Sequence, residues 1–87
     1  MSRYSLKPLP HRADLFEVAV GWDAGLNTYF AIVFGVPEVE CEPVVLSWTG
    51  TSPNQLTKLP ELASMLRHCA EIPPELMHRL RVDSCAY

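Results

Sequence analysis

The most informative part of the sequence is residues 15–36, which read LFEVAVGWDAGLNTYFAIVFGV. Apolar side chains alternate along residues 15–22 and again along residues 27–36, which is the period of β-strands. Between these two runs stands the turn signal Asp-Ala-Gly at residues 23–25. The segment therefore predicts a hairpin of two antiparallel strands.

A third strand is expected at residues 44–49, where large and small side chains alternate again. In all three expected strands the large side chains fall at even positions, which predicts a β-meander with one strongly apolar face. This predicted even face consists of Phe16, Val18, Val20, Trp22, Phe30, Ile32, Phe34, Val36, Val44, Leu46 and Trp48.

The C-terminal third of the chain has apolar residues at helical spacing. They predict an amphipathic helix over about residues 60–71, and Pro74 suits the first turn of a second helix that ends near Asp83. The two helices are the cover expected for the even face, so that Phe30 would meet Leu66 and Ile32 would pack beside them. The predicted fold class is α+β: a three-stranded antiparallel meander packed on one face by two short C-terminal helices (βββαα).

The length of the chain bounds its organisation. Eighty-seven residues, of which 48% are hydrophobic, suit one compact domain with one core. We expect residues 15–87 to form this single α+β domain. Residues 1–14 contain two prolines and show little periodicity, and they predict a flexible N-terminal arm.

Charge and cysteine content argue against several classes of protein. A net charge of −3 is unlike that of domains that bind nucleic acid directly, which usually carry a basic stripe. Three cysteines without a close pair do not resemble a disulfide framework, and no apolar run has the length of a signal peptide or a membrane span. We expect a cytoplasmic protein that contacts neither nucleic acid nor membrane directly.

No residue pattern predicts an active site, a metal or a cofactor. His68 and Cys69 are neighbours on the expected helix and point about 100° apart, and no Cys or His pair has the spacing of metal ligands. Nothing local assembles a Cys–His nucleophile or a phosphate-binding loop. We therefore expect a protein that is not an enzyme and holds no cofactor and no metal.

Two surfaces are candidates for binding a partner. The odd-numbered face of the sheet has small, weakly polar side chains, which either seat a partner or a second copy, or lie beneath the N-terminal arm. Residues 13–62 hold seven acidic residues and one lysine, and their carboxylates either replace phosphates in a basic groove or only keep a loop soluble. The candidate partner-binding residues are Asp14, Glu17, Asp23, Tyr29, Glu38, Glu40 and Glu42.

Three strings resemble a group of known proteins: GWD at residues 21–23, TYFA at 28–31 and WTGTSP at 48–53. Together with the leucine-rich helix, they resemble small uncharacterised proteins of bacterial plasmids, prophages and conjugative elements, over roughly residues 16–83. In those proteins proline tends to follow Gly-Trp-Asp, where this chain has Ala24.

The resemblance implies a function by context. Small acidic proteins of such elements are often inhibitors of host defence, including anti-CRISPR proteins. The expected function is thus a non-enzymatic, acidic, anti-CRISPR-like inhibitor that blocks a basic nucleic-acid-binding surface of a host protein complex. The alternative is a dimeric regulatory or antitoxin-like protein. The expected state is a monomer or a weak homodimer.

Overall fold

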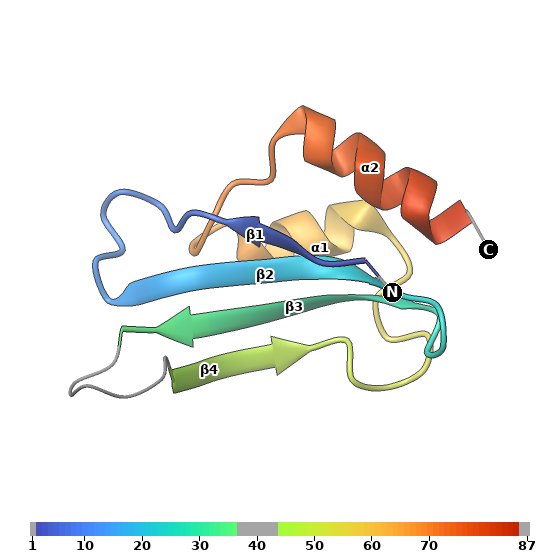
Figure 1. The fold of residues 1–87 in the computed structure, drawn as a ribbon, viewed down its shortest axis with the longest axis horizontal. Helices are drawn as coiled ribbons and strands as arrows, with labels where there is room; N and C mark the ends of the chain where they lie inside the picture. Colours follow the sequence, from blue (N-terminus) through green and yellow to red (C-terminus); the bar gives the residue numbers. More distant parts are fainter. Residues whose placement is uncertain (1, 37–43, 86–87) are drawn as a thin grey trace.

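The computed structural model describes residues 2–36 and 44–85. They form one antiparallel sheet with two helices on one of its faces (Figure 1), which confirms the α+β class. The sheet has four strands in the order β1-β2-β3-β4, and not three as predicted. The elements are β1 (Tyr4–Leu6), β2 (Leu15–Asp23), β3 (Thr28–Gly35), β4 (Val44–Thr49), α1 (Leu59–Leu66) and α2 (Pro74–Cys85).

The additional strand, β1, lies within residues 1–14, for which no regular structure was expected. It pairs with β2 so that Leu6 lies opposite Val18, and the N–H of Ser2 donates to the carbonyl of Trp22 at 3.0 Å. Leu6 is buried and belongs to the core. A strand of three residues is too short to show an alternating pattern, so periodicity does not indicate it.

The register of the β2–β3 hairpin determines which side chains face the helices. Asp23 pairs with Thr28 across a turn of four residues. From Val18 onward, each even-numbered residue of β2 therefore lies opposite an odd-numbered residue of β3. Val20, for example, lies opposite Ala31. Because residues opposite each other point to the same face, the prediction that even positions of all strands share a face is wrong.

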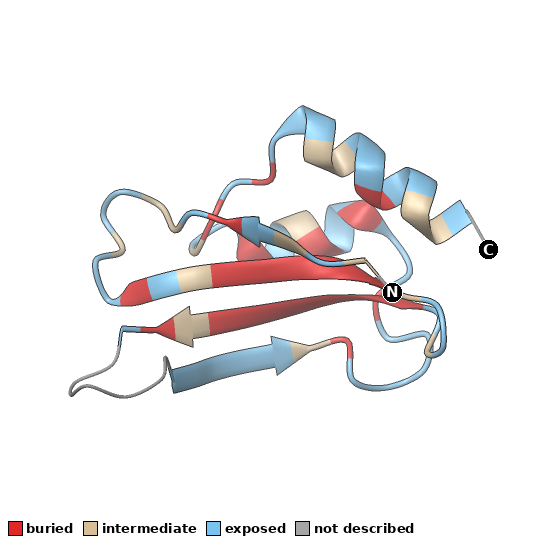
Figure 2. Cartoon of the chain, in the orientation of Figure 1, coloured by how far each residue is buried: buried red, intermediate tan, exposed pale blue. Residues whose placement is uncertain are grey.

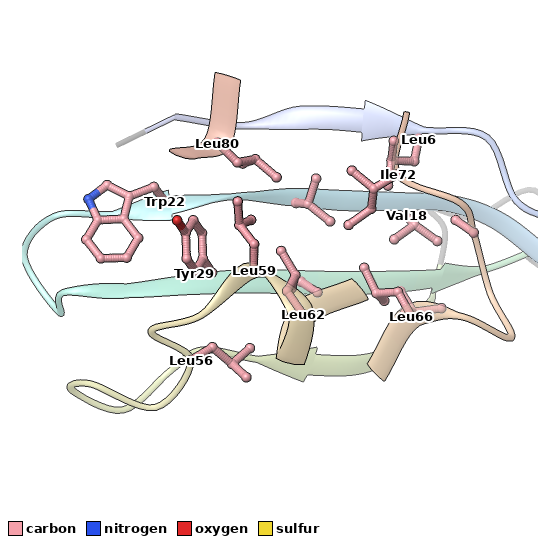
Figure 3. Packing of buried hydrophobic residues seen from close by; sticks show 14 of the residues in the cluster. Leu6, Val18, Trp22, Tyr29, Leu56, Leu59, Leu62, Leu66, Ile72 and Leu80 are labelled. Atoms are coloured by element: carbon pink, nitrogen blue, oxygen red, sulfur yellow. The ribbon is translucent and has the colours of Figure 1, made fainter. Parts of the chain in front are cut away.

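The helices cover even positions of β2 and odd positions of β3. α1 packs over β3 and α2 over β2, and Leu62 and Leu80 are fully buried between helices and sheet. Figure 3 shows this core from close by. From the two central strands it contains Val18, Val20, Trp22, Tyr29, Ala31 and Val33.

The opposite side of the sheet, called the open face below, is also apolar. Phe30 and Ile32 form a second cluster there with Ala19, and the half-buried Phe34 packs against it. The expected contact of Phe30 and Ile32 with Leu66 is therefore wrong, because the hairpin register turns both side chains away from α1. By their pairing, the open-face residues include Ser5, Glu17, Ala19, Gly21, Phe30, Ile32, Phe34, Val45 and Trp48.

A charge placed at Ala31 tests this assignment. Ala31 is 1% exposed beneath the helices, so Ala31→Arg should bury an unpaired cation and lower the free energy of unfolding by about 3–5 kcal/mol. The matched control is Ser5→Arg on the exposed side of β1, which should change it by about 0.5 kcal/mol or less. Urea unfolding followed by circular dichroism measures both. Equal stability of the two variants would show that Ala31 does not lie beneath the helices.

Candidate binding surface

A pocket lies on the open face beside Trp48. Its volume is about 380 Å³, and its floor is formed by Phe30 and Ile32, which are each 6% exposed. A cation, a carboxylate and the backbone of a tight loop stand at its rim. The remaining lining residues of this Trp48 pocket are Arg3, Asp23, Leu26, Gly50 and Thr51.

The loop that follows β4 forms one wall of the pocket. Gly50 has φ +90°, and a Cβ atom there would lie 2.2 Å from the carbonyl oxygen of Tyr29 and 2.6 Å from Cα of Phe30. Only glycine allows the chain to cross β3 this closely. The Oε1 atom of Gln55 then accepts hydrogen bonds from the N–H groups of Gly50 and Thr51, both at 3.1 Å. This wall is therefore held in place by a close backbone approach at Gly50 and by the side chain of Gln55.

The N-terminal segment forms the other wall. The backbone of Ser2 passes so close to Gly21 that a Cβ atom at Gly21 would lie 2.0 Å from the Ser2 carbonyl oxygen. The guanidinium carbon of Arg3 then lies 5.9 Å from the centre of the Phe34 ring, within the range of a cation–π contact. A positive charge thus borders an otherwise apolar surface.

Beyond the pocket, β4 exposes large apolar side chains. Four of its six residues expose about half of their surface: Val44 (54%), Val45 (49%), Leu46 (56%) and Trp48 (58%). Figure 2 shows β4 as exposed along its length, whereas most of β2 and β3 is buried. We call these four residues the β4 patch. Contiguous exposed apolar surface of this kind often marks an interaction site.

A β-bulge distributes the β4 patch over both faces of the sheet. Ser47 lies opposite Val33 and Val45 lies opposite Phe34, so Leu46 is an extra residue without a partner. Leu46 lines a second hollow together with residues of α1, on the helix side of the sheet. Val45 and Trp48 lie on the open face, so β4 exposes apolar side chains on both faces of the sheet.

Among the residues predicted to bind a partner, Asp14 already has one within the chain. Its two carboxylate oxygens accept hydrogen bonds from Nε and Nη2 of Arg12, both at 3.0 Å. Nη1 of Arg12 also donates to the carbonyl oxygen of His68 at 2.7 Å. The hydrogen bonds from Arg12 hold the pKa of the Asp14 carboxyl below its ordinary value. Asp14 thus helps to attach the segment before β2 to the end of α1.

Asp23 and Glu17 lie at opposite ends of β2. The Oδ1 atom of Asp23 accepts hydrogen bonds from the N–H groups of Gly25 at 3.0 Å and Leu26 at 3.3 Å, so Asp23 supports the hairpin turn and also borders the Trp48 pocket. Glu17 follows the bulge at the start of β2 and lies opposite Phe34 on the open face. The structure therefore does not bring the two carboxylates together.

Tyr29 is a core residue and not a surface residue. It is 3% exposed, its hydroxyl group donates to Oγ of Ser84 at 2.9 Å, and its ring lies edge-on to Trp22 at 4.8 Å. Glu38, Glu40 and Glu42 lie outside the described residues. Sequence reasoning placed Trp48 in the core. Trp48 is exposed because it lies opposite Ile32 on the open face, which neither helix covers, and the alternating pattern does not show which face the helices take.

No group of three His, Cys, Asp or Glu side chains among residues 2–36 and 44–85 could hold a metal ion. Cys69 is half-buried against the core, and Cys85 is exposed at the end of α2. In the same part of the chain no helix is long and apolar enough to cross a membrane.

No family model, curated protein or solved structure matches this chain. The resemblance to proteins of mobile elements therefore stays a prediction from the three sequence strings. The structure adds where they lie: the end of β2, the start of β3 and the end of β4 meet at one end of the sheet. Five residues of these strings line the Trp48 pocket, namely Asp23, Phe30, Trp48, Gly50 and Thr51.

The Arg12–Asp14 pair predicts a pH dependence of stability. Because the pKa of Asp14 is lower in the folded protein, its stabilising effect is present at neutral pH and is lost as the pH falls from about 4 through the folded pKa. Asp14→Asn should therefore melt below wild type at pH 7, and the difference should disappear near pH 2. Thermal melts at both pH values measure it. A difference of equal size at both values would contradict the role of the charge.

Proposed function

We propose that this chain is a non-enzymatic binding protein whose contact surface is the β4 patch together with the Trp48 pocket. The observation that carries the proposal is the exposure of four large apolar side chains on one uncharged strand. In the role expected from the sequence, the protein is an anti-CRISPR-like inhibitor of a host protein complex. The alternative role is that of a dimeric regulatory protein.

The size of the patch supports binding through apolar contact. Full burial of a large apolar side chain stabilises by about 1.5–3 kcal/mol, so covering the exposed halves of four is worth on the order of 3–6 kcal/mol before the entropic cost of association. Tryptophan is also enriched among the residues that contribute most to protein interfaces. Trp48 belongs to both the patch and the pocket, and we therefore place it at the centre of such a contact.

The described carboxylates give less support to mimicry of phosphates. Asp14 is already paired with Arg12, and Asp23 accepts two hydrogen bonds within its own turn. The part that Glu38, Glu40 and Glu42 would take rests on the sequence alone. We therefore assign the acidic residues the role of steering association with a basic partner, and the apolar patch the role of holding it.

Replacement of Trp48 tests the proposal. Trp48→Arg should fold normally, because the side chain is 58% exposed, but it should capture at least tenfold less of the protein that the wild type retains from a host lysate. Thr57→Arg, an exposed position outside the patch, is the matched control and should capture as the wild type does. Quantitative mass spectrometry of the captured protein measures all three.

The salt dependence of capture distinguishes an apolar contact from an electrostatic one. Capture through the patch should persist at about 1 M NaCl, where interactions between exposed charges are screened within roughly 3 Å. Capture that is lost at high salt and also lost on changing Glu38, Glu40 and Glu42 to Gln would favour phosphate mimicry instead. Equal capture by Trp48→Arg and wild type would remove the patch from the proposed function.

A further inference from the structure

We infer that β4 pairs with β4 of a second copy of this chain, antiparallel about a two-fold axis between Leu46 and Ser47. The sheets of the two copies would then join into one continuous sheet. The inference rests on the proposed function in one respect, since it assigns a partner to the same β4 patch. It commits to a second copy because the strand is complementary to itself.

The first observation is that β4 is an edge strand whose outer side pairs with no described residue. Natural edge strands usually carry charges or proline, or are very short, which prevents pairing with other chains. Val44–Thr49 has six residues and contains neither a charge nor a proline. The other edge, β1, has three residues, and its Tyr4 hydroxyl donates to Asp83 of α2 at 2.5 Å. Only β4 thus presents a long uncharged edge.

The second observation is the effect of the bulge on the direction of the side chains. In a regular strand, residues three apart point to opposite faces. Here the extra residue Leu46 lets Val45 and Trp48 share the open face, opposite Phe34 and Ile32 of β3. The other four residues of β4 lie on the helix side: Val44, Leu46, Ser47 and Thr49. Their pairing partners in β3, or the hollow that they line beside α1, indicate this side.

This distribution permits the one register that pairs all six residues of β4 with a second copy. Residues opposite each other in a sheet must point to the same face. An axis between Leu46 and Ser47 places these two opposite each other, and it also pairs Val45 with Trp48 and Val44 with Thr49. A shift of one position in either direction sets an open-face residue against a helix-side residue. The bulge therefore makes the whole strand self-complementary in this register.

The contacts between the two β4 strands in this register carry no charge, and those on the open face are apolar. On the open face Trp48 of each copy lies opposite the partner's Val45, so the same aromatic–aliphatic pair forms twice. On the helix side the two Leu46 side chains lie next to the axis. Because β4 has no charge, the net charge of −3 on each copy is not brought to the centre of the interface.

The area agrees with a weak dimer. A strand of six residues is about 20 Å long, and its half-exposed side chains offer on the order of 500 Å² per copy. The dimer would bury roughly 1,000 Å² in total, which is the lower limit for a specific interface. We expect a dissociation constant of about 1–100 μM, the range of weak specific complexes.

Sedimentation velocity of the full chain from about 1 to 500 μM tests the dimer. Wild type should shift from monomer to dimer across this range, and Ser47→Arg should stay monomeric because it places two cations beside the axis. Ser5→Arg, on the opposite edge of the sheet, should dimerise as the wild type does. Wild type that is monomeric at 500 μM, or Ser47→Arg that dimerises equally, would overturn the inference.

Nuclear magnetic resonance tests the register of the two β4 strands. In a sample that mixes isotope-labelled and unlabelled chains, intermolecular nuclear Overhauser effects should connect the Trp48 indole to the partner's Val45 methyl groups. A dimer without these effects would contradict the register. Failure of the dimer is distinct from failure of the proposed function: a monomeric wild type whose capture still depends on Trp48 refutes only this inference.

Discussion

The turn between β2 and β3 is the constraint on which the rest of the structure depends. Asp23 accepts two hydrogen bonds from the turn backbone, and Asn27 takes a left-handed conformation with φ 52°. The loop after β4 supports the same turn, because Asn27 donates to Asn54 at 2.6 Å and Thr28 Oγ1 accepts from the N–H of Leu56 at 2.8 Å. Because a slip of one residue would turn every side chain to the other face, these few hydrogen bonds determine both apolar clusters.

The register places apolar side chains on both faces of the sheet. The helix face receives the small Val20, Ala31 and Val33, on which helices pack closely, and also the larger Trp22 and Tyr29. Phe30 and Ile32 lie on the open face, where Trp48, residues at the pocket rim and the loop at Gly50 surround them in place of a helix. The chain thus builds two apolar faces but has helices for one. The β4 patch and the Trp48 pocket are what this imbalance leaves exposed.

The periodicity of the sequence is sufficient to predict three strands, the two helices and the α+β class, but it cannot predict the facing of β3. Both faces of β2 and β3 are apolar, so runs such as Tyr29-Phe30-Ala31-Ile32 alternate only weakly. The relative phase of two strands depends on the length of the turn and on bulges, which are set by backbone geometry. The pair of Arg12 and Asp14 is local in the sequence, but the hydrogen bond from Arg12 to the carbonyl of His68, after the end of α1, is a tertiary contact that periodicity cannot indicate.

Trp48 connects the two proposed contacts of this protein. It is the last open-face residue of the β4 edge, and it is also a wall of the pocket around which the three sequence strings meet. In the proposed dimer the partner's Val45 would lie opposite Trp48, so the self-association contact and the pocket would share this side chain. A substitution of Trp48 would therefore change both contacts. The bulge at Leu46, by placing Val45 and Trp48 on one face, is therefore the feature that joins self-association to binding.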